Sequence, residues 1–570
     1  MNRKGMERNV NQLFGEGAGK AAVTECDVLV VGGSLVGLSM ATLLGTHGIS
    51  ALVVEKHQGT AIHPRAGHFH LRTIEAFYSA GLEPVVRAES ERQFDPDGGI
   101  NAVESLAGKE IASYIGNLNE GVERFSPTKR LFMTQQSLEP ILRDGAQARG
   151  AGLNFATELL SFEQDATGVT ARVRHVNSGE TATIRAKYMI AADGNRSPIR
   201  EALGIAMHGH GLLSNSITIY FRADCGPWLA NRNLGVIYVL NPDLRGFFRL
   251  VRDGSSGFLV VNTVGDVSKP EATNVAEGIT VERCVEIVRS AIGVPDLPIE
   301  IEDIATWEAV ADVAERYRAG RVFLMGDAAH VVPPTGGFGG NTGVQDAHNM
   351  AWKLAMVLKG KAGPALLDTY DQERRPVGEL TIEQAYTRYV RRIAPELGMD
   401  DIQPLVDELS MEIGYRYQSP AIIAGEDALN SVWENPATAR GRPGSRAPHV
   451  PLVRDGKTIS TLDLCARNFA LLAGPEGGAW CEAARQAAAR LGVTLEAAQL
   501  DRSGPVADPQ GAFAEAFGIG PAGAALLRPD GFVAWRAKDA AGASGEAVTQ
   551  LLATALCRDA VAAVSEPAAA

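Results

Sequence analysis

The sequence predicts an α/β protein in three parts: a domain around a buried parallel sheet, an antiparallel sheet inserted into that domain, and a small α/β domain near the C-terminus. Two observations predict this order. Short β-branched and apolar runs that end in glycine, typical of buried parallel strands, occur at 27–31 and again at 321–325. Between them, over 206–310, polar and apolar residues alternate as in antiparallel strands.

The composition limits what the protein binds. The chain has 570 residues, of which 45% are hydrophobic and 21% charged. This is an ordinary globular composition, and the length suggests about two to four domains. The formal net charge is −13, so we expect no nucleic acid partner. Six cysteines lie scattered without a C-x-x-C spacing, which favours reduced thiols in a cytoplasmic protein over a zinc ribbon or a disulfide framework.

The N-terminal segment predicts no targeting signal. Residues 1–23 contain charges and glycines but no long apolar run, and we expect them to form a flexible tail. No stretch of the chain reaches the roughly 20 apolar residues that span a bilayer, so we expect no membrane partner.

The first elements predict a βαβ unit. A buried strand at 27–31 is followed by a glycine turn, a helix at 36–47 and a second strand at 49–55. This order is typical of a Rossmann-like, dinucleotide-binding domain. Another strand at 321–325 precedes a long helix expected at 343–360.

The remaining segments set the predicted domain boundaries. Alternating runs at 217–222 and 246–251 predict strands of the inserted sheet. Residues 436–449 are rich in Pro, Gly and Arg, as linkers often are. The predicted parts are 24–205 and 311–435 for the two halves of the first domain, 206–310 for the inserted sheet, 436–449 for the linker and 450–570 for the C-terminal domain.

The turn after the first strand carries a dinucleotide-binding motif. Gly32 and Gly37 occupy the first and sixth positions of the glycine fingerprint, but Ser34 replaces the third glycine. The helix that begins near Leu35 and Val36 offers free N–H groups to phosphates. The acid that ends the second strand, Glu55, is suited to accept hydrogen bonds from a ribose, and Lys56 follows it. The alternative is a tight strand–helix turn without a ligand.

A second motif carries a family resemblance. Gly326-Asp327-Ala328-Ala329-His330 is followed by Pro333-Pro334-Thr335-Gly336-Gly337-Phe338-Gly339-Gly340-Asn341. With these residues the chain, over about 24–400, resembles the class A FAD-dependent aromatic monooxygenases, in the phenol hydroxylase and aromatic polyketide hydroxylase branch. The resemblance implies that Asp327 binds the ribityl hydroxyls of FAD. It also implies that the segment with Pro334, Gly337, Gly340 and Asn341 wraps the isoalloxazine ring. His330 has the alternative of a capping or packing role.

Three shorter segments extend the resemblance. Asp193, in an Asp-Gly turn, matches a family aspartate near FAD and the path of NAD(P)H. Arg65, in Arg65-Ala66-Gly67, matches a segment that contacts the flavin, although a surface salt bridge is an alternative role. Gln135 matches a glutamine near the ribityl chain, with Gln136 as a rival one position on.

The resemblance implies non-covalent FAD as cofactor, with NAD(P)H and O2 as co-substrates. No His or Cys sits in a recognised flavin attachment motif, and no second dinucleotide fingerprint exists for a resident nicotinamide. The implied activity is hydroxylation of a phenolic or polycyclic, polyketide-like aromatic substrate through a C4a-hydroperoxyflavin. A Baeyer–Villiger oxygenase on the same fold and a flavin-binding protein without turnover are the alternatives. The Trp-x-Trp-x-Ile-Pro motif of flavin halogenases is absent from the sequence.

The substrate site is less determined by the sequence than the cofactor site. The phenol hydroxylase branch has an acid near the position of Gly67, so the group that activates the substrate is not identified here. His68 and His70 lie next to this glycine, and a polar helix start is their alternative role. The candidates for lining the substrate pocket from the inserted sheet are Tyr220, Tyr238, Phe248 and Phe258.

The C-terminal domain resembles the thioredoxin-like domain of the same branch. Trp480-Cys481 is similar to the start of a thioredoxin site, but the second cysteine is replaced by Ala484. A dithiol cycle needs two thiols, so we expect a redox-inactive domain that serves structure or docking. The sequence leaves a monomer and a homodimer open as oligomeric states.

Overall fold

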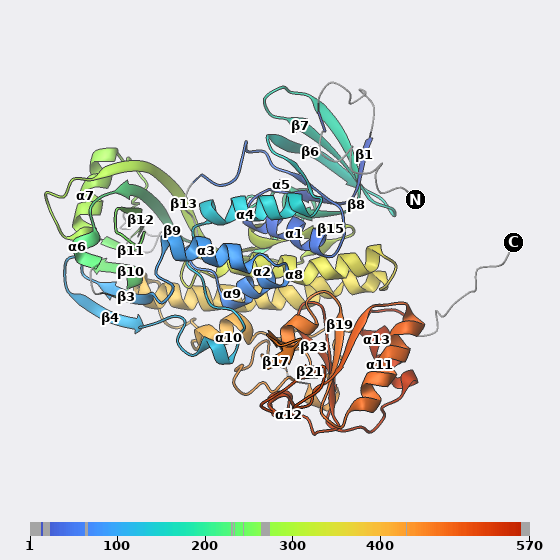
Figure 1. Cartoon of the computed structure of the whole chain (residues 1–570). Coiled ribbons are helices and arrows are strands. Elements are labelled where there is room, and N and C mark those ends of the chain that lie inside the picture. Colours follow the sequence, from blue (N-terminus) through green and yellow to red (C-terminus); the bar gives the residue numbers. More distant parts are fainter. Residues whose placement is uncertain are drawn as a thin grey trace.

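The computed structural model describes residues 13–14, 23–62, 67–229, 232, 234–242, 244–263, 274–428 and 430–559. Its three parts are visible in Figure 1: the first domain in the upper centre and right, the inserted sheet at the left, and the C-terminal domain in orange and red below. No helix in these ranges is both long enough and apolar enough to cross a membrane.

The first domain is built around an eight-stranded sheet. Its strand order is β14-β15-β8-β1-β2-β5, and the antiparallel pair β6–β7 joins it through β8. The pairs β1–β2, β1–β8, β8–β15 and β2–β5 are parallel. The strands are β1 (Val23–Val31), β2 (Ala51–Val54), β5 (Gly152–Asn154), β6 (Thr157–Gln164), β7 (Val169–His175), β8 (Thr181–Ala191), β14 (Arg318–Ala319) and β15 (Val322–Leu324).

Helices surround this sheet and carry the segments of interest. The predicted helices at 36–47 and 343–360 are confirmed as α1 and α8, with slightly different ends. The helices of the first domain and the insert are α1 (Leu35–Thr46), α2 (Leu71–Ser79), α3 (Glu83–Gln93), α4 (Gln135–Ala148), α5 (Pro198–Ala202), α6 (Gly226–Leu229), α7 (Val281–Ile292), α8 (Phe338–Leu358), α9 (Thr369–Arg392) and α10 (Glu408–Ile413).

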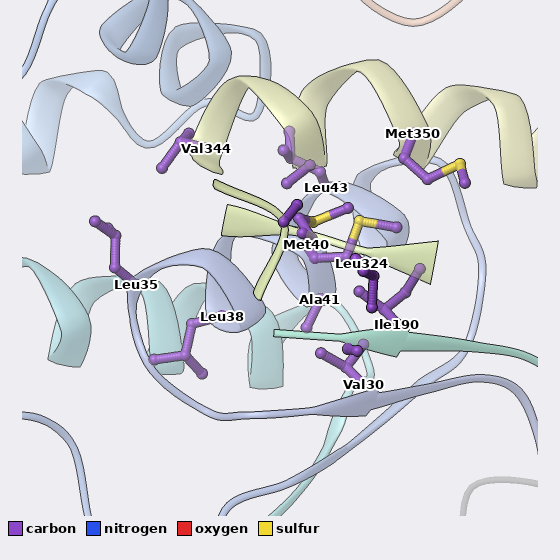
Figure 2. Close-up of a cluster of buried hydrophobic side chains, with 14 of the residues drawn as sticks. Val30, Leu35, Leu38, Met40, Ala41, Leu43, Ile190, Leu324, Val344 and Met350 are labelled. Carbon is purple, nitrogen blue, oxygen red and sulfur yellow. The ribbon is translucent and has the colours of Figure 1, made fainter. Parts of the chain in front are cut away.

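The core of the first domain lies between α1, α8 and the parallel strands. Figure 2 shows Leu38 and Leu43 of α1 and Met350 of α8 with Ile190 of β8 and Leu324 of β15. All five side chains are buried. Burying each of them contributes about 1.5–3 kcal/mol, so this contact fixes the two helices firmly on the sheet. The N-terminal ends of both helices are thereby fixed as well.

The inserted part is a second eight-stranded sheet, of order β16-β13-β9-β12-β11-β10-β3-β4. Residues 99–115, which lie within the predicted segment 24–205, contribute β3 and β4 to this sheet, and β3 pairs in parallel with β10. The strands are β3 (Gly99–Val103), β4 (Glu110–Ile115), β9 (Met207–Arg222), β10 (Leu234–Asn241), β11 (Leu244–Leu250), β12 (Ser256–Asn262), β13 (Glu300–Ala314) and β16 (His330–Val331).

The two faces of the inserted sheet have different neighbours. One face packs against α7 in a core that contains Ile219, Phe248 and Cys284. We call the opposite face, which carries Tyr238 and Phe247, the inner face. Tyr238 belongs to the core of the first domain, and Phe247 packs against that core. The inner face is therefore the side of the inserted sheet that meets the first domain.

The C-terminal domain is thioredoxin-like, with a mixed sheet of order β20-β19-β22-β23. The predicted linker 436–449 is packed rather than free: Gly444 N–H donates to Val533 O at 2.8 Å and Ala447 N–H to Gly531 O at 2.8 Å. The elements are β17 (Pro451–Arg454), β18 (Lys457–Ser460), β19 (Phe469–Ala473), α11 (Gly478–Leu491), β20 (Leu495–Gln499), β21 (Val506–Ala507), α12 (Phe513–Phe517), β22 (Ala524–Leu527), β23 (Val533–Ala537) and α13 (Gly545–Ala555).

Candidate functional site

The glycine motif forms a tight connection from β1 to α1. Gly32 has φ +108°, and a Cβ on it would lie 2.1 Å from Ala192 O. A Cβ on Gly37 would lie 1.9 Å from Gly32 O, so α1 approaches the turn as closely as only glycine permits. Ser34 is the N-cap of α1, but its side chain makes no capping hydrogen bond. The first N–H groups of α1, at Leu35 and Val36, therefore have no side-chain cap, and an anion suits such groups.

The Ser34 side chain is instead bound by α4. Its hydroxyl donates to the Glu139 carboxylate and accepts from Gln135 Nε2 at 2.8 Å. Glu139 also accepts from Gln135 Nε2 and from the Ala61 N–H, both at 2.6 Å, and is fully buried. Gln135 thus lies at the dinucleotide turn, while Gln136 is exposed. Glu139 was not predicted, although its i,i+4 spacing from Gln135 on a helix was a usable signal.

Glu55 lies beside the same turn, at the end of β2. One carboxylate oxygen accepts from the Gly33 N–H at 2.7 Å, and the other accepts from the His57 N–H at 2.8 Å. The carboxylate is thus held next to the glycine motif, where the ribose of a dinucleotide would lie. Lys56, by contrast, is exposed.

The Gly-Asp motif follows β15 in a short 3-10 turn at Gly326–Ala328. Gly326 has φ +59°, and a Cβ on it would lie 2.9 Å from Val36 Cγ2, so this turn touches the start of α1. Asp327 in the turn is exposed. The exposed carboxylate and the start of α1 therefore lie on the same side of the parallel sheet.

Buried charges hold this turn in place. Asp346 accepts from the Gly326 N–H at 3.1 Å, from His330 Nε2 at 2.7 Å and from Arg374 Nε at 2.7 Å. Burial would raise the pKa of Asp346, but the charges of His330 and Arg374 outweigh it and keep the pKa below its ordinary value. His330, Asp346 and Arg374 are completely buried, and the contact between His330 and Asp346 helps to hold the turn.

The Pro-Gly segment ends at the N-terminus of α8. Gly337, with φ +68°, is the N-cap, and it offers no side chain to the first N–H groups of the helix. Its N–H donates to Pro334 O at 3.1 Å. A Cβ on Gly340 would lie 2.9 Å from Leu35 Cδ2, so the N-termini of α8 and α1 lie side by side. Two uncapped helix N-termini thus face the same region.

Asn341 joins this segment to the two candidate histidines. Its amide donates to His68 O at 3.0 Å and to Gly337 O at 2.7 Å, and its oxygen accepts from the His70 N–H at 2.9 Å. His70 Nε2 also lies 3.0 Å from Gly336 O. Both histidines therefore lie at the start of α8 rather than on the surface. Burial lowers the pKa of both rings.

Asp193 and Arg65 complete the predicted cofactor residues. Asp193 follows β8 and accepts from the Ser197 hydroxyl at 2.6 Å, and burial raises its pKa. Its turn adjoins the glycine motif through the contact of Gly32 with Ala192. Arg65 lies outside the described residues.

These features fit FAD. Free N–H groups and the positive ends of α1 and α8 suit a pyrophosphate and an electron-rich ring edge. The carboxylates of Glu55 and Asp327 suit ribose and ribityl hydroxyls, since carboxylates accept strong hydrogen bonds. The glycines at 32 and 37 leave the backbone approach that a dinucleotide needs.

The candidates for the substrate pocket divide between the two faces of the inserted sheet. Tyr220 and Phe258 pair across β9 and β12, with ring centroids 6.2 Å apart, on the inner face. Tyr238 lies on the same face, 6.0 Å from Phe247. Phe248 lies on the opposite face, in the core against α7. Phe248 therefore does not line the inner face, and the adjacent Phe247, which was not predicted, lies there instead.

Tyr238 also lies beside a cation of α9. The Cζ atom of Arg392 is 6.0 Å from the centroid of the Tyr238 ring. Burial raises the pKa of the Tyr238 hydroxyl, and Arg392 offsets only part of this effect. The hydroxyl therefore stays protonated at neutral pH, as a hydrogen-bonding group on the inner face.

Comparisons with known families identify both main parts of the chain. Residues 25–385 match the model of the FAD binding domain, and residues 440–558 match that of the C-terminal domain of aromatic-ring hydroxylases. The chain belongs to the FAD-dependent aromatic-ring hydroxylases. It is an NAD(P)H-dependent flavoprotein monooxygenase, with FAD as cofactor and O2 as the second co-substrate.

Relatives of this aromatic-ring hydroxylase cover nearly its whole length. A 4-methyl-5-nitrocatechol 5-monooxygenase of Burkholderia sp. is 57% identical over 94% of this chain and 98% of the relative. A tetracenomycin A2 monooxygenase-dioxygenase of Streptomyces glaucescens is 42% identical over 93% of this chain and 97% of the relative. The structure of an aklavinone-11 hydroxylase with FAD and aklavinone aligns with a TM-score of 0.88 at 38% identity, over 94% of this chain and 100% of the other.

Asp327→Ala should weaken FAD binding by about ten- to a hundredfold, because each charge-assisted hydrogen bond is worth roughly 1.5–3 kcal/mol. The measurement is flavin fluorescence during titration of the FAD-depleted enzyme. Asp165→Ala, in the exposed turn between β6 and β7, is the control and should leave the affinity unchanged. Equal affinity in Asp327→Ala and wild type would argue against this role.

Cys481→Ser should leave turnover nearly unchanged. The thiol is buried in α11, burial raises its pKa, and position 484 is a buried alanine. All six cysteines are free, so no disulfide is available to carry electrons. The measurement is product formed per NAD(P)H consumed at matched flavin content. A loss beyond about tenfold, or roughly 1.4 kcal/mol of barrier, would show that the thiol takes part.

Proposed function

We propose that this enzyme hydroxylates a phenolic aromatic ring, either a substituted catechol or a polycyclic, polyketide-like phenol. One observation carries the proposal: the inner face of the inserted sheet presents the aromatic side chains of Tyr220, Tyr238, Phe247 and Phe258. Aromatic rings bind one another through offset or edge-to-face contacts, so this face suits a flat aromatic substrate. The names of the relatives, which refer to nitrocatechol, tetracenomycin and aklavinone, support the same class.

The residues of the two sites have separate tasks in this reaction. FAD bound at this site would supply the redox chemistry, taking electrons from NAD(P)H and activating O2. The inner-face aromatics hold the substrate ring flat and exclude water around it. The protonated hydroxyl of Tyr238, beside Arg392, offers a hydrogen bond to a substrate hydroxyl and so orients the ring. Asn341 keeps the segment of His68 and His70 against the start of α8.

The test is substrate-stimulated NAD(P)H oxidation with analysis of the product. The panel contains 4-methyl-5-nitrocatechol, a tetracyclic polyketide phenol and a polycyclic ketone, each with ¹⁸O2. We expect stimulation by a phenol and one ¹⁸O atom on its ring. Oxygen inserted between ring carbons of the ketone would instead identify a Baeyer–Villiger reaction. Oxidation of NAD(P)H that no aromatic compound stimulates would contradict the proposal.

We further propose that the enzyme acts in the cytoplasm, as a monomer or a homodimer, without a nucleic acid partner. The net charge of −13 and the six free cysteines support this assignment. Light scattering behind gel filtration measures the oligomeric state, and a species larger than a dimer would contradict it.

A further inference from the structure

Arg249 is a buried cation without a carboxylate. It lies on β11, on the inner face of the inserted sheet, and is 4% exposed. Among the residues that the structure describes, none with a carboxylate forms an ion pair with it. One guanidinium nitrogen donates to Gly235 O, while Nε is buried without a hydrogen-bond partner. A buried charge with an unused donor is costly, and such groups are typical of sites where a ligand supplies the partner.

Two aromatic rings support the guanidinium without neutralising it. Its Cζ atom lies 4.1 Å from the ring centroid of Phe132 and 4.5 Å from that of Phe94. Cation–π contacts of this kind act on the faces of the guanidinium, and they supply no hydrogen-bond acceptor for its N–H groups. Burial lowers the pKa of Arg249 to about 9, so the group is still charged at neutral pH.

Arg249 lies between the cofactor segment and the aromatic inner face. It pairs in register with Phe258, which pairs in turn with Tyr220. On its other side, a Cβ on Gly67 would lie 3.2 Å from Arg249 Nε, so the glycine lets the guanidinium cover the backbone directly. Gly67 precedes His68, whose Cβ would lie 3.9 Å from a Cβ on Gly337 at the start of α8. The cation is therefore close to both predicted sites.

His68 leaves the charge of Arg249 uncompensated. Its ring stacks on Phe132 with centroids 5.1 Å apart, and its Nε2 is buried without a partner. Burial, followed by the nearby cationic groups His70, Arg130 and Arg249, holds the pKa of His68 well below its ordinary value. The neutral imidazole adds a polar atom to this region but no positive charge that would repel the guanidinium.

We propose that Arg249 forms an anion subsite that binds the ionised phenol oxygen of the aromatic substrate. The inference rests on the proposed function and deepens it, since it names the form in which the phenol binds. A phenolate oxygen would accept a charge-assisted hydrogen bond from the guanidinium and supply its missing negative partner. A phenolate is also the more electron-rich ring, so the subsite favours the form that reacts with an electrophilic oxygen. Glycine stands at position 67, near which the phenol hydroxylase branch has an acid, so the negative charge opposite Arg249 must come from the substrate.

The experiment compares two probes on the FAD-loaded enzyme: 4-methyl-5-nitrocatechol and its di-O-methyl ether, which has no ionisable oxygen. Calorimetry gives both dissociation constants. Difference spectra, taken at a pH where the free nitrocatechol is mainly protonated, show whether the bound form is the yellow phenolate. We expect wild type to bind the phenolate and to discriminate strongly against the ether. Arg249→Met should lose about ten- to a hundredfold in affinity for the nitrocatechol, keep its affinity for the ether and lose the phenolate spectrum.

Arg245→Met is the matched control. Arg245 lies four residues earlier on the same strand and face, but it is already paired with Glu396 at 2.7 Å. This variant should behave as wild type. Arg249→Lys keeps the charge and should keep the phenolate spectrum, which preserves the test if the methionine variant fails to hold FAD.

Three results would contradict the proposal that Arg249 forms an anion subsite. They are unchanged discrimination in Arg249→Met, equal losses for the two probes, and a lysine variant that binds only the neutral phenol. A wild-type enzyme that binds neither probe, and that no aromatic compound stimulates, would overturn the proposed function as well.

Discussion

Arg528→Met should destabilise the folded enzyme by about 3–5 kcal/mol, the usual cost of removing one partner from a buried ion pair. Arg528 follows β22 in the C-terminal domain and reaches α9 of the first domain. Its two terminal nitrogens donate to Glu373 at 2.6 and 2.9 Å, and Nε donates to Asp530 at 3.0 Å. The side chains of Arg528 and Glu373 are fully buried.

The size of this effect follows from what remains after the substitution. Burial would raise the pKa of Glu373, but Arg528 and then Lys353 hold it far below its ordinary value. Without Arg528, Lys353 is the cation that remains in contact with Glu373, while Asn349 and Ser419 still donate hydrogen bonds to this carboxylate. Two buried carboxylates, Glu373 and Asp530, would then share one cation.

Urea titration followed by circular dichroism and by tryptophan fluorescence measures the loss. Fluorescence is informative because Trp352 of α8 lies 5.0 Å from the Cζ atom of Arg528. The control is Arg454→Met, which removes a half-exposed pair with Glu496 in the same domain and should cost at most about 1 kcal/mol. Similar unfolding midpoints for the two variants would show that the buried contact is not what joins the domains.

This contact also explains why a thioredoxin-like domain without a dithiol belongs to the enzyme. A second buried group, in which Arg446 of the C-terminal segment binds Glu75 of α2 beside Arg72, joins the same two domains. Helix α2 begins directly after His70, and α8 begins at the predicted flavin site. The domain therefore packs against two helices, α2 and α8, whose N-termini lie at the predicted cofactor and substrate residues, and we expect its task to be structural.

Much of the first domain could be predicted because its signals are local. The apolar run of β1, the glycine turn and α1 follow one another within about 20 residues, and each element has its own pattern. The pairing of β3 with β10 could not be predicted, since it joins segments more than 130 residues apart and no local pattern sets its register. In the sequence, β3 and β10 are recognisable only as short apolar runs.

For the substrate site, the direction of the side chains was the main feature that could not be predicted from the sequence. Phe247 and Phe248 are adjacent, and both faces of the inserted sheet are apolar because α7 covers one and the first domain the other. Alternation alone therefore does not tell which ring points inward. Arg249 was missed for a related reason: arginines are usually exposed, and nothing local shows that this one is buried. Glu139 and Asp346 act through tertiary contacts with turns far away in the sequence.

Gly37→Ala should reduce FAD affinity by about ten- to a hundredfold, because overpacking by one methyl group costs about 1–3 kcal/mol and the shift occurs at the binding turn. The new Cβ would lie 1.9 Å from Gly32 O and 3.3 Å from Val30 Cγ1. The backbone of this turn cannot yield without cost, since Gly32 itself already lies against Ala192 O. The helix α1 must therefore move away from β1.

That movement would affect both helix N-termini at once, because α1 touches α8 where Leu35 approaches Gly340. Flavin content after purification and the FAD dissociation constant measure the effect. Gly59→Ala is the control: its Cβ would meet nothing within 4 Å, and its affinity should equal that of wild type. A Gly37→Ala enzyme with full flavin content and unchanged affinity would show that the turn tolerates a side chain and that close helix approach is not what builds the site. A parallel loss of flavin and of substrate-stimulated NAD(P)H oxidation, with the fold intact by circular dichroism, would instead place the start of α1 at the centre of cofactor binding.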